Sequence, residues 1–374
     1  MKKLLPEVCT IQYGFPFDSA KFSDSNGMPL IRIRDVVRGY SETYTTEEYK
    51  SEYIVHENDL LIGMDGEFNI AKWGKTPALL NQRVCRLAPK DSIDKDYLFY
   101  FMPIALKQIE EKTPFVTVKH LSAKELNKIE IPVLPLEEQR KIAETLSKVD
   151  ELIAFREQQL AKLDELIKAR FVEMFGDEQT FNKEPLSQNV EEMFIGPFGS
   201  SLKNENFVSK ENGYCMVYEQ KHAIRKTMDV ETRYIDKPKY EELKRFSIHG
   251  GDIIVSCRGT IGETYIIPLN APLGIMHPSI MKIRVKDSIY NRVFFDFLLQ
   301  EKLKQHEAQA NGSGVKMAVT ASALGKEEFI VPSIPLQNQF SSFVERVDQQ
   351  KQTVQQSLEK LELMKKALMQ EYFG

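Results

Sequence analysis

The chain carries two copies of one pattern, and each copy ends in a long segment with heptad periodicity. A Pro-x-x-Pro-Leu-x-x-Gln element occurs at 132–139 and again at 332–339, which is 200 residues later. The heptad segments close with Phe-Gly pairs at 175–176 and 373–374, which lie 198 residues apart, so the second copy is two residues shorter. A duplication of this size constrains the chain to a pseudo-symmetric fold and favours a pseudo-symmetric partner.

Each heptad segment predicts one helix with a narrow apolar stripe. Proline lacks an amide donor and restricts the residue before it, so the first helix should start at about Leu136. The stripe of the first helix consists of Ile142, Leu146, Val149, Ile153, Leu160, Leu163, Ile167 and Met174. The stripe of the second helix consists of Phe340, Val344, Val347, Val354, Leu358, Leu361 and Leu368. Cations interrupt both stripes, at Arg156 and Arg170 and at Lys351 and Lys365.

Neither predicted helix can bury its stripe alone. A helix of about 40 residues spans roughly 60 Å, which is more than the width of the globular segment before it. The nearest partner for each stripe is the helix of the other copy, and we therefore predict an antiparallel coiled coil. The alternative is that each helix packs on its own globular segment.

A globular segment with mixed strand and helix signals precedes each long helix. Residues 58–73 predict a strand, a glycine-rich turn and a second strand, and residues 250–268 repeat that order. An apolar helix follows at 97–112 in the first copy and at 291–309 in the second.

The predicted fold class is α+β, with two tandem mixed α/β domains separated by two long helices that form an antiparallel coiled coil. The first domain covers residues 1–133 and the second covers residues 179–333. The central spacer helix lies in residues 134–178 and the C-terminal spacer helix in residues 334–374.

Composition limits the compartment and the partners. The net charge is −4, so any surface for nucleic acid has to be local. The four cysteines are scattered singly with no Cys-x-x-Cys pair, which indicates a reducing cytoplasm and argues against zinc and a disulfide framework. No run of about 18 apolar residues occurs, so we expect no membrane partner.

The sequence lacks the motifs of catalysis. A methyltransferase would need a glycine-rich cofactor turn after a strand, and the nearest stretches, 259–262 and 312–314, have the wrong spacing. No phosphate-binding Gly-x-x-x-x-Gly-Lys-Ser/Thr loop occurs, and the six histidines are isolated. We therefore expect a binding protein with no catalytic residues, no metal and no cofactor.

The first candidate contacts to a nucleic acid lie where a strand follows a turn, because Lys and Arg suit phosphates while Arg, Asn and Gln suit base edges. Arg32 and Arg34 alternate with isoleucines, which places both guanidinium groups on one face of a predicted strand. The second copy offers Gln220, Lys221 and Arg225 at the comparable position.

Two further places complete the candidate set. The glycine-rich turn carries Asn69 and Lys72 in the first copy and Arg258 in the second. Lys119 and Lys316 precede the proline-rich elements and lie at a constant offset of 197 residues. Because the chain is net acidic, a DNA-binding surface has to concentrate its cations at places such as these.

These features resemble the specificity subunit of type I restriction–modification systems. The resemblance covers the whole chain and rests on two variable segments, each followed by a Pro-Leu-x-x-Gln element and a charged heptad helix. The first copy, PLEEQ at 135–139, fits the family pattern better than PLQNQ at 335–339, which lacks the acidic residues.

The resemblance implies a non-catalytic, cytoplasmic subunit that reads a bipartite target in double-stranded DNA, one half per recognition domain. It also implies docking of two methyltransferase subunits and association with the restriction and translocase subunits. The helices would set the number of unread base pairs between the halves. The alternatives are a coiled-coil scaffold without DNA binding and a divergent DNA methyltransferase.

Overall fold

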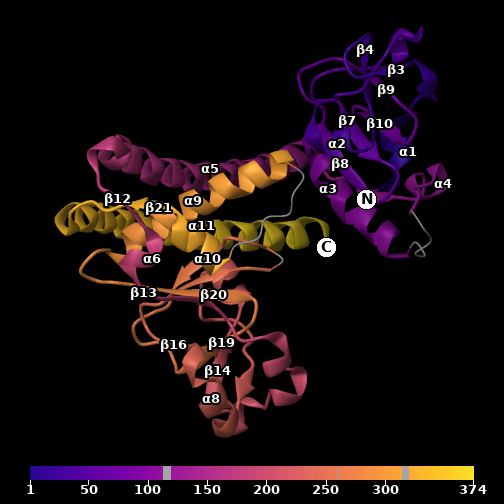
Figure 1. The fold of residues 1–374 in the computed structure, drawn as a ribbon. Coiled ribbons are helices and arrows are strands. Elements are labelled where there is room, and N and C mark those ends of the chain that lie inside the picture. Colours follow the sequence, from indigo (N-terminus) through magenta and orange to yellow (C-terminus); the bar gives the residue numbers. More distant parts are fainter. Residues whose placement is uncertain (113–118, 259, 314–319) are drawn as a thin grey trace. The chain divides into compact units, whose positions relative to one another are not determined.

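The chain forms two compact units, and each long helix contributes one part to each of them (Figure 1). Unit 1 consists of residues 1–159 and 354–374, and unit 2 consists of residues 160–353. The computed structural model describes residues 1–112, 119–258, 260–313 and 320–374. None of the helices in these ranges is long and apolar enough to cross a membrane.

Unit 1 contains a four-stranded antiparallel sheet and a five-stranded sheet. The first has the order β2-β10-β7-β8, with β2 (Cys9–Tyr13), β7 (Leu60–Gly63), β8 (Asn69–Lys72) and β10 (Val84–Pro89). The second has the order β3-β5-β4-β9-β6, with β3 (Phe22–Ser23), β4 (Met28–Ile31), β5 (Tyr44–Thr45), β6 (Ile54–Val55) and β9 (Ala78–Leu80). A separate pair joins β1 (Lys2–Leu4) to β11 (Glu130–Pro132).

Unit 2 repeats this topology with its own strands, except that its mixed sheet has four described strands, none of them a counterpart of β3. Its antiparallel sheet has the order β13-β20-β17-β18, with β13 (Val190–Ile195), β17 (Ile253–Ser256), β18 (Thr264–Ile266) and β20 (Ile280–Val285). Its mixed sheet has the order β15-β14-β19-β16, with β14 (Cys215–Tyr218), β15 (Tyr234–Ile235), β16 (Ser247–Ile248) and β19 (Gly274–Met276). The separate pair joins β12 (Lys183–Pro185) to β21 (Glu328–Ile330).

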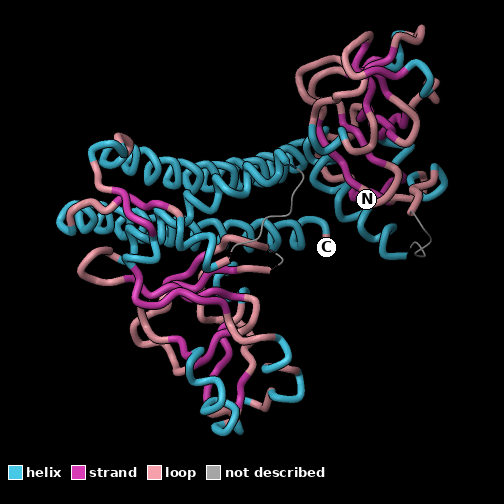
Figure 2. Tube along the Cα trace, viewed as in Figure 1, coloured by secondary structure: helices cyan, strands magenta, loops and turns pink. Residues whose placement is uncertain are grey.

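The helices follow the same duplication (Figure 2). Unit 1 contains α1 (Leu5–Val8), α2 (Asp35–Arg38), α3 (Lys95–Lys112) and α4 (Ala123–Leu126). Unit 2 contains α6 (Leu186–Asn189), α7 (Gln220–Arg225), α8 (Lys237–Leu243), α9 (Arg292–Ser313) and α10 (Ala321–Lys326). The long helices are α5 (Leu136–Phe175) and α11 (Ile334–Phe373). The expected apolar helices and strand–turn–strand segments are therefore confirmed.

The main core of each unit forms around its apolar helix, α3 or α9, where the end of a long helix inserts an aromatic side chain. In unit 1 the ring of Phe373 packs against Tyr97 and Phe101, at centroid distances of 5.2 and 5.8 Å. In unit 2 the ring of Phe175 packs against Phe294 at 4.9 Å. The two Phe-Gly endings therefore occupy equivalent core positions.

The predicted antiparallel pairing of the long helices is confirmed in each unit by polar contacts along the seam. In unit 1, Lys365 forms an ion pair with Asp150 at 2.6 Å, and Arg156 donates to the Ser357 hydroxyl at 3.2 Å. In unit 2, Lys351 forms an ion pair with Asp164 at 2.7 Å. Three of the cations that interrupt the apolar stripes, Arg156, Lys351 and Lys365, therefore bond to the opposite helix, whereas Arg170 pairs with Glu173 of its own helix.

The structure corrects the alignment of the two repeats. The Pro135 carbonyl accepts the amides of Glu138 and Gln139, and the Ser333 carbonyl makes the same bonds in the other copy, to the amides of Leu336 and Gln337. Equivalent residues at the starts of the two long helices therefore lie 198 positions apart (135 to 333), and the offset of 200 inferred from the proline motif is wrong. Because Phe175 and Phe373 share this offset, neither helical copy is shortened.

The first turn of each long helix explains why the proline motifs gave the wrong offset. Helix α5 starts at Leu136, as expected, directly after Pro135. Helix α11 starts at Ile334, so Pro335 lies inside its first turn. Proline is tolerated there because the first-turn amides have no partner within the helix.

Candidate nucleic-acid interface

In each unit two parallel strands end side by side and deliver polar loops to one edge. In unit 1, β4 pairs with β9 in parallel, and in unit 2, β14 pairs with β19 in the same way. The residues that follow these strands are Arg32 and Asn81 in unit 1 and Glu219 and His277 in unit 2. Carboxyl ends of parallel strands are common ligand-binding positions in α/β folds.

The antiparallel sheet of each unit adds two more loops to this edge. The turn after β7 is joined to the loop before β10, because the Met64 amide donates to the Arg83 carbonyl at 2.9 Å. The Cys257 amide donates to the Ser279 carbonyl at the same distance in unit 2. We call these loop clusters the recognition edges; they comprise 14–19, 32–34, 64–68, 81–83 and 119–120 in unit 1 and 196–201, 219–222, 257–258, 260–263 and 277–279 in unit 2.

Glycine is required where the first loop crosses the edge. A Cβ atom at Gly14 would lie 2.0 Å from the Asn81 carbonyl oxygen, and one at Gly196 would lie 2.3 Å from the His277 carbonyl oxygen. These backbones can approach each other only without a side chain at the crossing position. The same packing therefore builds both recognition edges.

The recognition edge of unit 1 contains an ion-pair cluster beside a cavity. His120 Nδ1 lies 2.6 Å from Asp65 Oδ1, and Arg83 Nε lies 3.5 Å from Asp65 Oδ2. A cavity of about 360 Å³ opens beside them and is lined by Arg32, Gln82 and other residues of the edge. Guanidinium and amide groups at one cavity can contact both phosphates and base edges.

The structure corrects the placement of Arg32 and Arg34. Strand β4 ends at Ile31, and Asp35 accepts the Arg32 amide at 2.8 Å as the chain turns into α2. Arg34 precedes that helix, so the two guanidinium groups do not share a strand face. Both side chains are exposed at the recognition edge.

The other unit 1 candidates are divided between the edge and the interior. Lys119 lies at the edge, where its carbonyl accepts the Gly66 amide, although its ammonium group bonds Glu110. Asn69 is the first residue of β8, beside the turn, and donates to the Glu67 carbonyl at 3.2 Å. Lys72, at the other end of β8, forms an ion pair with Asp96 of α3 at 2.8 Å. The turn itself therefore holds neither Asn69 nor Lys72.

The recognition edge of unit 2 is built around Glu219. Its carboxylate accepts a hydrogen bond from Arg233 and forms an ion pair with Lys221 at 2.9 Å. Burial acts to raise the pKa of Glu219, but the hydrogen bonds from these two cations outweigh it and hold the pKa below its usual range. Glu219 therefore carries a negative charge that holds two cations at the edge.

His277 lies within electrostatic reach of three cations at the same edge. Burial lowers its pKa, and Arg233, Arg258 and Lys221 lower it further, while Glu219 opposes them. The imidazole is held at Nδ1 by the Ser279 hydroxyl at 2.7 Å. A neutral, oriented imidazole among cations suits hydrogen bonding to a base edge or a phosphate.

The remaining unit 2 candidates lie on or beside α7 rather than on a strand. Gln220 and Lys221 open this helix and Arg225 ends it, so the expected strand position is corrected to a helix. The Gln220 Oε1 atom is buried without a hydrogen-bond partner among the described residues, and Arg225 is exposed. Arg258 is exposed in the turn after β17. Lys316 lies outside the described residues.

Sequence reasoning missed the residues that follow β9 and β19. Asn81, Gln82 and Arg83 follow an apolar strand, which is a usable signal because all three can pair with bases in a bidentate manner. Arg233 and His277 had no such signal. The antiparallel pairing of β15 with β14 brings Arg233 to Glu219, and the parallel pairing of β19 with β14 brings His277 to the same place. Among the residues after β9, Arg83 adopts the left-handed backbone conformation, with a φ of 75°.

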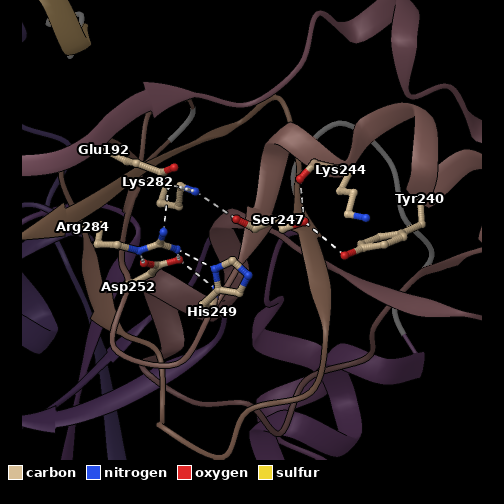
Figure 3. A network of polar contacts seen from close by, with 8 residues as sticks. All are labelled: Glu192, Tyr240, Lys244, Ser247, His249, Asp252, Lys282 and Arg284. Carbon is tan, nitrogen blue, oxygen red and sulfur yellow. Dashed lines mark hydrogen bonds and ion pairs between the residues drawn. The ribbon is translucent and has the colours of Figure 1, made fainter.

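Buried cations fix the two sheets of each unit against each other below the edge. In unit 1, Arg86 donates to the Ile54 carbonyl of β6 at 2.8 Å. In unit 2, Lys282 donates to the Ser247 carbonyl of β16 at 3.0 Å and pairs with Glu192 (Figure 3). These cations are structural, because each is used within the fold.

The carboxylates beside them, Asp59 and Asp252, occupy equivalent positions, although their cationic partners do not. Asp59 pairs with Arg86 at 2.9 Å, and Asp252 pairs with Arg284 at 2.7 Å (Figure 3). Among the described residues no group of three His, Cys, Asp or Glu side chains could hold a metal ion. The arrangement at both edges is therefore one of charged and amide groups suited to recognition.

Comparison with known proteins gives a family match over most of the chain. A family model described as "Type I restriction modification DNA specificity domain" matches residues 1–165 and 199–363. The EcoBI specificity subunit of Escherichia coli is 41% identical over 164 residues, which is 43% of this chain and 34% of that protein. The chain therefore matches about a third of the length of that relative.

Other relatives match over greater lengths. The MjaVIII specificity subunit of Methanocaldococcus jannaschii is 22% identical over 377 residues, covering 91% of this chain and 87% of that protein. The crystal structure of a type I restriction–modification S subunit from M. genitalium superposes with a TM-score of 0.60 at 16% identity, over 100% of this chain and 96% of that one. This likeness confirms the two-domain α+β fold.

Proposed function

This chain belongs to the type I restriction modification DNA specificity family, and from that premise we propose that it reads a bipartite target in double-stranded DNA. Each recognition edge would contact one half of the target. The chain would act as the non-catalytic subunit that directs methyltransferase subunits to adenines in that target. One half-site would be read by unit 1 and the other by unit 2.

The duplicated recognition edge is the observation that carries this proposal. Each edge lies at the end of an equivalent pair of parallel strands, β4 with β9 in unit 1 and β14 with β19 in unit 2. Both edges hold cations together with amide or imidazole groups. Phosphate contacts require cations, and base contacts require donors and acceptors in fixed positions. The edges differ in nearly all of these side chains, so we expect the two half-sites to differ in sequence.

We assign roles at the unit 1 edge by side-chain type and exposure. Arg32 and Arg34 are exposed and suit phosphates, and Lys119 lies beside them with its ammonium already bonded to Glu110. Gln82 is exposed and has an amide group that suits an adenine edge, whereas Asn81 is buried and its Oδ1 accepts the Gln82 amide. Asn69 would support the turn, and Lys72 would pack β8 on α3 through its ion pair with Asp96.

At the unit 2 edge we assign phosphate contacts to Lys221, Arg225 and Arg258. His277 and Gln220, which are both partly exposed, would supply the groups that contact bases; Gln220 would do so through its amide nitrogen, because its Oε1 atom is buried. Lys316 stays a candidate from its sequence position alone.

The long helices would serve two purposes. Their lengths would determine the number of base pairs between the half-sites, as subunit spacing does in dimeric DNA readers. Their outer faces and flanks would dock two methyltransferase subunits, and restriction and translocase subunits would join that assembly. The equivalence of the helix starts at Gln139 and Gln337 supports two similar docking sites.

A map of methylated adenines tests this function. DNA would be sequenced from cells that express the chain together with the methyltransferase encoded beside it, and from cells that express the methyltransferase alone. A two-part motif that appears only with the chain is the expected result. Identical maps, with the complex shown to form, would instead support a scaffold without DNA recognition.

A further inference from the structure

The loop after β13 presents an aromatic ring to solvent at the unit 2 edge. Phe198 is 86% exposed, which is more than any other phenylalanine in the described ranges. The apolar area of this ring is removed from water only when a partner covers it. The ring is therefore suited to contact a partner.

The backbone under this ring is fixed on both sides. Pro197 is buried and restricts the chain that enters the loop. The Phe198 carbonyl accepts the Ser201 amide at 2.8 Å, and Leu202, which is 5% exposed, anchors the exit. The ring is thus carried on a short, ordered projection, which reduces the entropy lost when it contacts a partner.

The projection belongs to the cationic recognition edge. Gly196, which starts it, crosses the His277 carbonyl so closely that no Cβ atom fits. His277 in turn has Lys221, Arg233 and Arg258 as electrostatic neighbours. A phosphate backbone drawn to these cations would bring the duplex against the ring.

Duplex DNA offers one type of apolar surface that matches a planar ring, namely the faces of its stacked bases. Aromatic and aliphatic side chains at DNA surfaces reach these faces by entering a base-pair step. The equivalent loop of unit 1 lacks such a projection, because Phe15 packs against Phe17 at 5.0 Å and against Tyr53 at 5.4 Å. The two edges therefore differ in this respect.

We propose that Phe198 is a wedge that enters a base-pair step in the half-site read by unit 2, opens the stack and bends the duplex there. This inference rests on the proposed DNA-reading function. It assigns the deformation to one half of the target, since unit 1 keeps its aromatic rings packed together. Steps that unstack easily, such as pyrimidine–purine steps, would then be favoured at that position without a hydrogen bond to a base.

The test uses the complete chain in complex with its methyltransferase and a duplex carrying the mapped target. The fluorescent base 2-aminopurine is placed in turn at each adenine of the two half-sites other than the methylated ones, because its emission rises when stacking is lost and a methyltransferase itself extrudes its target base. The wild-type complex should raise the emission at one step of the unit 2 half-site. Phe198→Ala should abolish that rise and weaken binding about tenfold, whereas Phe198→Trp should retain both.

Leu269→Ala is the matched control, because Leu269 is 79% exposed in the loop that leads from β18 to β19, at the opposite end of these strands. It should leave emission and affinity unchanged. The proposed wedge is contradicted if the Phe198→Ala complex has the same affinity for the target and the same 2-aminopurine emission as the wild-type complex. It is also contradicted if that variant loses the methyltransferase in sedimentation without DNA, since the ring would then contact protein. If the wild-type complex binds the mapped target no more tightly than an unrelated duplex, the DNA-reading function itself is contradicted.

Discussion

Gln139 and Gln337 hold the same position in the two units and make the same three hydrogen bonds. Each side chain is fully buried and accepts one backbone amide at 2.8 Å, from Asp94 in unit 1 and from Asn291 in unit 2. Each also donates to one carbonyl just before the apolar helix and to one just before its own long helix. One buried amide therefore joins the start of each long helix to the start of α3 or α9.

Replacing Gln139 with alanine should destabilise unit 1. The change leaves a buried amide and two carbonyls without a partner, which costs about 2–4 kcal/mol in free energy of unfolding. Gln337→Ala should have a similar effect on unit 2. Hydrogen exchange of each unit is the measurement, and Gln158→Ala, on an exposed position of α5, is the control. Exchange equal to that of the control would contradict the role assigned to these glutamines.

The same glutamines show how far the sequence determined the alignment of the repeats. The heptad stripes and the strand–turn–strand segments were predictable, because they depend on local periodicity. The register of the repeats was not, because Gln139 is fixed by partners that lie before α3, far from it in sequence. The similar Pro-Leu-x-x-Gln letters at 335–339 lie two residues out of that register.

The recognition edges show a second limit of prediction. Alternation with isoleucines suggested a strand through Arg32 and Arg34, but Asp35 accepts the Arg32 amide and turns the chain into α2. The three candidate places were found in sequence, yet only the pairing of β4 with β9 and the contact of His120 with Asp65 bring them together. These contacts join residues that lie far apart in the sequence, so local patterns could not predict which candidate places meet at one edge.

Substitution of one edge should affect one half-site only. Arg32→Ala should weaken binding about fivefold to twentyfold wherever the unit 1 half is intact, and should reduce the salt dependence without changing base preference, because one phosphate contact is lost. Arg258→Ala should do the same in the unit 2 half. Titrations of targets mutated in each half measure both effects. Lys75→Ala, an exposed cation at the opposite end of β8 and β9, is the control, and equal loss in both halves would contradict the modular arrangement.

Acid should remove a stabilising contribution that comes from Glu219. Its pKa is lower in the folded protein than the ordinary value of 4.5, so its contribution is full above that value and is lost as the pH falls through the folded pKa. Between pH 7 and pH 3, the stability of the wild type should therefore fall more steeply than that of Glu219→Gln. Thermal unfolding across this range is the measurement. Parallel profiles would contradict the charge assigned to Glu219, and Glu205→Gln, at an exposed carboxylate, is the control.

Lengthening both long helices should lengthen the unread spacer of the target. One heptad inserted after Gln159 in α5 and another after Thr353 in α11 would fall at the boundary between the units, so the pairing inside each unit is kept. Seven helical residues add about 10 Å, or roughly three base pairs. Methylation mapping should then find both half-sites unchanged and about three base pairs further apart. An insertion in α5 alone should abolish recognition, because Asp150 and Asp164 could no longer pair with Lys365 and Lys351 in one register. An unchanged spacer in the double insertion would show that the helices do not set the distance.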